Sequence, residues 1–99
     1  MNPNDRATPA KVLGAYGKCA WCGRRILSTE FDRHHWMVKR GRKSTRNFKK
    51  IDVVINVVPV HHECHMNHGQ SIEMYDRCRA MVIAKFGADT VEQWRDRWI

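Results

Sequence analysis

Residues 56–68 read Asn-Val-Val-Pro-Val-His-His-Glu-Cys-His-Met-Asn-His, a hydrophobic run that leads into histidines and one cysteine. The β-branched residues within 51–60 favour a buried strand, which Pro59 should end. The residues after it predict a short helix that begins near His62 and is broken by Gly69. A strand followed by a histidine-rich helix is therefore expected at the centre of the chain.

Two pairs of side chains have the spacing of zinc ligands. Cys19 and Cys22 form a Cys-x-x-Cys pair, and His61 and Cys64 form a His-x-x-Cys pair. At these spacings, two side chains of one segment can meet the same tetrahedral Zn²⁺. Four protein ligands would close the site, so we expect a structural zinc that staples a small core. His62 is the alternative fourth ligand.

A second set of polar residues has the composition of a hydrolytic site. A histidine doublet should end a strand within residues 26–37. Neutral imidazoles bind divalent metals, and an unligated histidine is a good general base near pH 7. Phosphodiester hydrolysis needs both functions. The set comprises the doublet, an asparagine of the next strand and two histidines on one helical face: His34, His35, Asn56, His65 and His68.

The charge balance indicates an anionic partner. The 99 residues carry a formal net charge of +8, from 18 Lys and Arg against 10 Asp and Glu. Such an excess favours nucleic acid. Seven cations, with no acidic residue among them, occupy a predicted loop between the two halves of the proposed site, where they would neutralise phosphates: Lys39, Arg40, Arg42, Lys43, Arg46, Lys49 and Lys50. A solvated loop without a partner is the alternative for this charge run.

The cysteines and the hydrophobic runs bear on the cellular setting. Cys19 and Cys22 are too close in sequence for a typical structural disulfide, and Cys64 lies among histidines. Reduced thiolate ligands are therefore favoured over the two disulfides of a secreted protein. The first residues lack the hydrophobic region of a signal peptide, and no hydrophobic run is long enough to span a bilayer. We expect a cytoplasmic protein without a membrane partner.

The chain has the length of one domain, residues 1–99. We expect a loose N-terminal arm over 1–10, a short helix over 11–16, the knuckle and core over 18–69, and a helical extension over 70–99. Ser71 is a plausible cap for a helix that Gly87 closes. One face of this helix carries Tyr75, Cys78 and Val82, flanked by Met74 and Met81. A last helix should begin at Asp89 or Thr90 and pack through Val91, Trp94 and Trp98.

The ordered combination resembles a known family. His34-His35, Asn56 and Cys64-His65-x-x-His68 look like the motif of HNH endonucleases, a ββα-metal site. The two zinc-ligand pairs look like the zinc knuckle of the zinc-containing members. The resemblance covers about residues 18–69. It implies an α+β fold with a small ββα-metal core and zinc knuckle, followed here by two C-terminal helices.

The resemblance also implies a metal-dependent DNA endonuclease that nicks DNA or cuts both strands. His34, His65 and His68 would hold one catalytic divalent metal, such as Mg²⁺, Mn²⁺ or Ni²⁺, which stabilises the leaving 3′ oxygen. His35 would be the general base that activates water, and Asn56 would orient it. Free-standing proteins of this kind and size are similar to those encoded by phages and other mobile elements.

The chain departs from the family pattern at three positions. His61 stands where cysteine is usual, and Trp36 stands where an aliphatic residue is usual. His68 follows His65 by three residues where four is common, so a phosphate contact is an alternative role for His68. The alternative function is a non-catalytic zinc-ribbon module that binds nucleic acid. Such a module has no need of the histidine and asparagine set.

Overall fold

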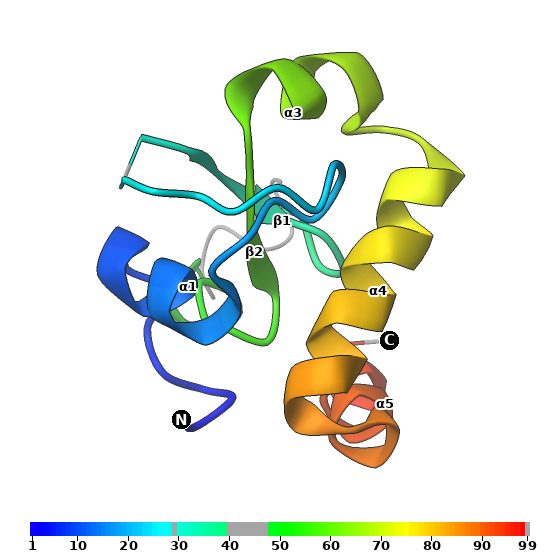
Figure 1. Cartoon of the computed structure of the whole chain (residues 1–99). Coiled ribbons are helices and arrows are strands. Elements are labelled where there is room, and N and C mark those ends of the chain that lie inside the picture. Colours follow the sequence, from blue (N-terminus) through cyan, green and yellow to red (C-terminus); the bar gives the residue numbers. More distant parts are fainter. Residues whose placement is uncertain (29, 40–47, 99) are drawn as a thin grey trace.

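A β-hairpin lies at the centre of the molecule, with helices around it (Figure 1). The computed structural model describes residues 1–28, 30–39 and 48–98. The α+β class and the two C-terminal helices are as the sequence predicts. The elements follow the order α1 (Pro9–Tyr16), β1 (Asp32–His35), α2 (Phe48–Ile51), β2 (Val57–Val60), α3 (His62–His68), α4 (Ile72–Phe86) and α5 (Ala88–Asp96).

Strands β1 and β2 pair in antiparallel fashion, with His34 opposite Val58 and His35 opposite Val57. The chain then passes through one residue into α3, which contacts β1. In Figure 1, α3 lies at one end of the hairpin, and α1 and α4 lie on either side of it. This arrangement brings the histidines of β1 and α3 to the same end of the hairpin.

Pro59 does not end the strand as predicted, because it lies inside β2 opposite Arg33. Residues of an antiparallel strand point their backbone groups alternately toward and away from the partner strand. The Pro59 carbonyl accepts a hydrogen bond from the backbone N–H of Ala20, at 2.9 Å, on the side of β2 away from β1. Proline is tolerated here because its missing N–H is not needed for pairing with β1.

Residues 51–60 comprise the last residue of α2, an irregular segment and β2, instead of the single strand predicted. The N-terminal residues cause this difference. The sequence predicts a loose arm over 1–10, but residues of this segment form hydrogen bonds with residues 52–54. The N–H of Ala7 donates to the carbonyl of Asp52 at 2.8 Å, and the N–H of Val54 donates to the carbonyl of Asp5 at 2.9 Å. These long-range bonds take the backbone groups that a continuous strand would offer to a neighbour.

Helix α4 covers the core through the side chains that its periodicity predicts. Met74, Cys78 and Val82 are buried, and the Ser71 hydroxyl caps the helix by accepting from the N–H of Met74 at 3.0 Å. Helix α5 begins at Ala88, one to two residues before the caps expected for it. Gly87, at a φ of 90°, ends α4 and turns the chain directly into α5.

The hairpin, the knuckle segment and the C-terminal helices share one hydrophobic core. Trp36 is 2% exposed and donates its indole N–H to the Ile55 carbonyl at 2.9 Å. Trp94 of α5 packs into the same cluster. Within the described part of the chain, the helices are too short or too polar to cross a membrane.

Candidate metal centres and catalytic site

The Cys19–Cys22 segment is a tight turn held by its own backbone. Cys19 accepts at its carbonyl from the N–H of Gly23 at 3.0 Å, and its N–H donates to the Arg24 carbonyl at 2.9 Å. Gly23 has a φ of 73°, a conformation that other residues rarely adopt. The turn places Cys19 in the core and Cys22 at the surface, with both thiols directed to one point.

Four side chains converge on that point. The donor atoms of Cys19, Cys22, His61 and Cys64 all lie within 4.8 Å of one another, close enough to hold one metal ion. The Cys22 sulfur lies 3.2 Å from His61 Nδ1. His62, the alternative ligand, instead pairs with Asp32 outside the cluster. The chain's four cysteines all lie in the described residues, and none forms a disulfide.

The electrostatics of the cluster favour a cation. Burial and the neighbouring Cys19 and Cys22 raise the pKa of the Cys64 thiol to about 12. Burial opposes ionisation of Cys19, but hydrogen bonds from backbone groups outweigh it and lower the pKa of this thiol. Repulsion from Cys19 and Cys22 therefore opposes the ionisation of Cys64. A divalent ion relieves that repulsion, so three cysteines and one histidine fit zinc.

His34 and His65 meet at the contact of β1 with α3. Their ring centroids are 5.0 Å apart at an interplanar angle of 64°. His34 is 6% exposed, and burial, together with the nearby His65, Lys39 and His35, lowers its pKa to about 4. His34 is therefore neutral at physiological pH, which is the form that binds a metal.

Asp32 holds the outer edge of the His65 ring. Its Oδ2 lies 2.9 Å from His65 Nδ1 and 2.8 Å from His62 Nδ1. Partial burial opposes ionisation of Asp32, but hydrogen bonds from His65 and His62 lower the pKa of the carboxyl overall. A carboxylate on Nδ1 fixes the tautomer of His65 and leaves Nε2 as the electron-pair donor, the usual arrangement behind a metal-bound histidine.

His68 lies apart from the two paired histidines. Its ring stacks on Trp21 of the knuckle, with centroids 3.8 Å apart and planes within 11°. Arg77 of α4 covers the Trp21 ring at 4.2 Å. Among the described residues, no second group of three His, Cys, Asp or Glu donors is as close as the cluster of three cysteines and His61. The assignment of His68 to metal or phosphate stays a prediction, and its observed contact links α3 to the knuckle.

His35, next to His34 and directed to the other face of β1, pairs with a buried acid. Its Nε2 lies 3.1 Å from Oδ1 of Asp52, which is 5% exposed. Arg33 reaches the second carboxylate oxygen at 3.8 Å. The proposed general base is therefore part of a carboxylate–imidazole pair.

Asn56 is fully buried and clamps the chain that follows His35. Its Oδ1 accepts from the backbone N–H groups of Met37 and Val38, at 3.2 and 2.9 Å. Its Nδ2 donates to the carbonyls of Val38 and Ile51, at 2.8 and 3.0 Å. The described contacts of Asn56 thus fix the backbone around the His35–Asp52 pair, and the bonds go to main-chain groups.

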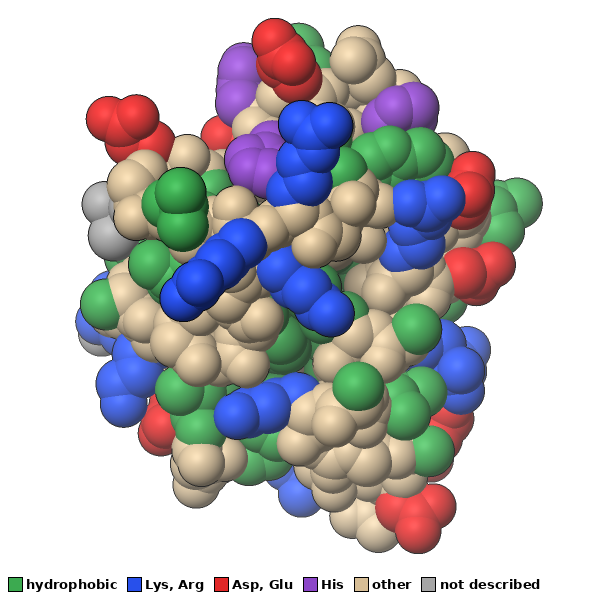
Figure 2. All heavy atoms as spheres, in the orientation of Figure 1, with side chains coloured by type: hydrophobic (Ala, Val, Ile, Leu, Met, Phe, Trp, Pro, Cys, Tyr) green, Lys and Arg blue, Asp and Glu red, His purple; other side chains and the backbone are tan. Residues whose placement is uncertain are grey.

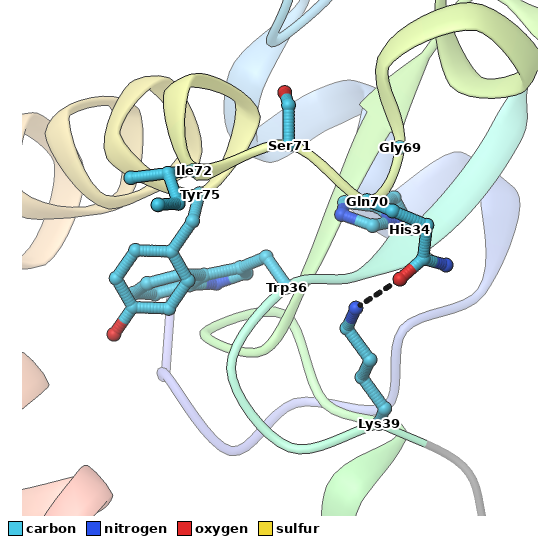
Figure 3. Close-up of a pocket in the computed structure, with 8 residues that line it drawn as sticks. All are labelled: His34, Trp36, Lys39, Gly69, Gln70, Ser71, Ile72 and Tyr75. Carbon is cyan, nitrogen blue, oxygen red and sulfur yellow. Dashed lines mark hydrogen bonds between the residues drawn. The ribbon is translucent and has the colours of Figure 1, made fainter.

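A pocket of about 260 Å³ opens beside His34 (Figure 3). Trp36 and Tyr75 lie on one side of it, with ring centroids 5.2 Å apart. On the other side, Lys39 Nζ donates to the side-chain oxygen of Gln70 at 3.0 Å. The pocket therefore offers an aromatic wall and a cationic edge next to a neutral imidazole.

The basic cluster is only partly within the described residues. Lys39 and Lys50 are exposed. The backbone of Lys49 belongs to α2, and its side chain lies outside the described residues, as do Arg40, Arg42, Lys43 and Arg46 entirely. On the face shown in Figure 2, Lys and Arg side chains spread across the middle, and acidic side chains lie mostly toward its edge.

Asp32 and Asp52 are the site residues that sequence reasoning missed. Asp32 had a detectable signal, because side chains two apart on a strand share a face and His34 follows it by two. No pattern in the sequence indicated Asp52, because a single strand over 51–60 would not bring its side chain to His35.

No protein-family model matches the chain, and comparisons with curated proteins and solved structures also found no match. Its function is therefore inferred from the geometry of its own residues.

Proposed function

We propose that the chain is a metal-dependent DNA endonuclease of the HNH type. The observation that carries this proposal is the placement of two neighbouring histidines on opposite faces of β1. His34 faces His65 of α3, and His35 faces Asp52. One face has two imidazoles that could hold a metal, and the other has an imidazole paired with a carboxylate. A histidine doublet with a purely structural role would not need its two side chains on opposite faces of β1 with different partners.

In the proposed reaction, His35 takes a proton from a water molecule, and the water oxygen attacks the phosphorus of a phosphodiester. The bond to the 3′ oxygen breaks, and this oxygen takes a proton from a solvent water, which leaves a 5′-phosphate and a 3′-hydroxyl. His34 and His65 fit a divalent metal, and Asp32 fixes the tautomer of His65. A metal held there would neutralise charge on the phosphate and the leaving oxygen.

The pocket beside His34 is the proposed place for the substrate backbone. Lys39 at its edge supplies a positive charge, and we propose that the basic cluster of residues 39–50 continues along the phosphates. Neutralising Arg42, Lys43 and Arg46 together should flatten the slope of log K against log salt by about three, close to one for each phosphate that is no longer neutralised. An unchanged slope would assign these residues to a solvated loop.

For the cluster of Cys19, Cys22, His61 and Cys64, we propose zinc with a structural role. The soft donor set favours this metal, and four protein ligands leave no position for substrate. The stack of Trp21 on His68 would couple the zinc-bound knuckle to the position of α3. Metal analysis of the purified protein, with an expected one zinc per chain, tests this assignment.

Cleavage of a supercoiled plasmid tests the proposed activity. Wild-type protein should convert the plasmid to nicked or linear DNA with Mg²⁺, Mn²⁺ or Ni²⁺, and EDTA should stop it. The His35→Ala variant should bind DNA and keep its zinc, yet cut about 10²–10⁴-fold more slowly. Retarded migration of DNA without cleavage under any of these metals would instead support the zinc-ribbon binding module. That module would share the one four-donor cluster found among the described residues.

A further inference from the structure

We infer that Asp52 is a positioning residue that sets which ring nitrogen of His35 accepts the proton from water. The inference rests on the proposed nuclease function and adds a residue to its machinery. It starts from the 3.1 Å contact between His35 Nε2 and Asp52 Oδ1. Both side chains are shielded from solvent, with exposures of 13% for His35 and 7% for Asp52.

The carboxylate is held in place by its surroundings before any substrate arrives. The carbonyl of Asp52 accepts from the N–H of Ala7 at 2.8 Å, and the neighbouring Val53 forms an isolated β-bridge with Arg6. Arg33 lies 3.8 Å from the second carboxylate oxygen. The backbone of Asp52 is thus anchored, and its carboxylate lies between Arg33 and His35.

A carboxylate accepts hydrogen bonds and does not donate them, so we place the ring proton of His35 on Nε2, at the 3.1 Å contact. A neutral imidazole with its proton on Nε2 carries its lone pair on Nδ1. Asp52 therefore selects Nδ1 as the atom that takes the proton from water. When Nδ1 has taken it, the same carboxylate stabilises the imidazolium that forms.

A rival role for Asp52 is purely structural, as the anchor of Arg33. Arg33 is 40% exposed and also donates to the Ala7 carbonyl at 2.8 Å, so it ties β1 to the N-terminal segment. An Arg33→Met variant removes this ion pair and leaves the Asp52–His35 contact intact. It is therefore the matched control for a substitution of Asp52.

The Asp52→Asn variant should reverse the tautomer preference. Arg33 can only donate, so it favours the amide oxygen of the new side chain on its own side. The amide N–H₂ group then faces His35 Nε2 and donates to it, which moves the ring proton to Nδ1. This change of tautomer is an effect that loss of an anchor for Arg33 would not produce.

Nitrogen-15 NMR of the histidine rings reads the tautomer directly, in zinc-loaded protein without added catalytic metal. Wild type and Arg33→Met should show the proton on Nε2 of His35, and Asp52→Asn should show it mainly on Nδ1. A wild-type protein with the proton on Nδ1 would overturn the inference, even if the variant failed to fold.

Single-turnover cleavage then tests the consequence. Asp52→Asn should lower the rate at saturating DNA by about 10²–10⁴-fold with little change in DNA affinity. In a His35→Ala background it should lower the rate no further, because it acts through His35. An active wild type whose rate and tautomer survive Asp52→Asn refutes the positioning role alone. A wild type that cuts no DNA refutes the nuclease function, and the catalytic role of Asp52 with it.

Discussion

The Asn56→Ala substitution should destabilise the protein strongly, although it removes no charge and little hydrophobic surface. Asn56 is fully buried and makes four hydrogen bonds to main-chain groups of Met37, Val38 and Ile51. Each such bond contributes about 1 kcal/mol net, and buried groups left without partners cost more. Water can reach the half-buried Met37 and Val38, so we expect a loss of about 2–4 kcal/mol.

Urea unfolding of the zinc-loaded protein measures this loss. With a slope of about 2 kcal/mol per molar urea, in the middle of the usual range, the midpoint should fall by roughly 1–2 M. Asn67, which is exposed on α3, provides the matched control, and Asn67→Ala should change the free energy of unfolding by less than about 0.5 kcal/mol. Asn56→Asp adds a second comparison, because a carboxylate cannot donate to the Val38 and Ile51 carbonyls.

Equal midpoints for Asn56→Ala and Asn67→Ala would refute the role of Asn56 as a clamp. A stable Asn56→Ala protein without cleavage activity would indicate a different role for Asn56. It would mean that Asn56 acts on His35 or on substrate directly, and not through the backbone hydrogen bonds described above.

Three further predictions follow from individual contacts. Cys22→Ser should lose the bound zinc and lower the melting temperature; one tightly bound zinc and an unchanged melting curve would show the cluster to be wrongly assigned. Gly69→Ala should displace His65, because the added Cβ would lie 2.5 Å from the His65 carbonyl oxygen and 2.9 Å from its ring. Gly14→Ala is the control: its Cβ meets nothing closer than 3.9 Å, so this substitution should stabilise α1 by about 0.5–1 kcal/mol. The pKa of His34 is about 4 in the folded protein and 6.5 ordinarily, so the unfolded chain binds the extra proton between these values and stability should fall as pH drops through this window. Unfolding of His34→Gln, measured from pH 7 to pH 5, should show a shallower loss than wild type, and parallel curves would contradict the shift.

Local signals predicted those parts of the fold that depend on neighbours in sequence. Helix α4 could be predicted from its hydrophobic periodicity and its end residues. Ser71 caps it, and Cys78 and Val82 are buried on the face where the periodicity places them. The spacing of Cys19 and Cys22 likewise reflects one turn, and the structure brings the second ligand pair to it. Ligand pairs and amphipathic faces are readable because their geometry is set within a few residues.

Interactions between distant segments were not readable in the same way. Residues 52–55 have the composition of a strand, yet their backbone groups form hydrogen bonds with residues 3–7. That change brings Asp52 to His35, and no local pattern encodes it. The stack of His68 on Trp21 is similar, because it depends on how the knuckle packs against α3. The sequence therefore identified the histidines but not the acids and rings that hold them.

Single-turnover cleavage of an end-labelled DNA duplex, with mapping of the product ends, tests the central claim most directly. Wild-type protein should cut the duplex only with an added divalent metal and leave 5′-phosphate and 3′-hydroxyl ends, and His35→Ala should nearly abolish the cleavage. His35→Ala protein should retain its zinc, its fold and its affinity for DNA. Cleavage at the wild-type rate by a folded His35→Ala protein, or intact duplex with wild type under every metal tested, would contradict the proposed nuclease mechanism.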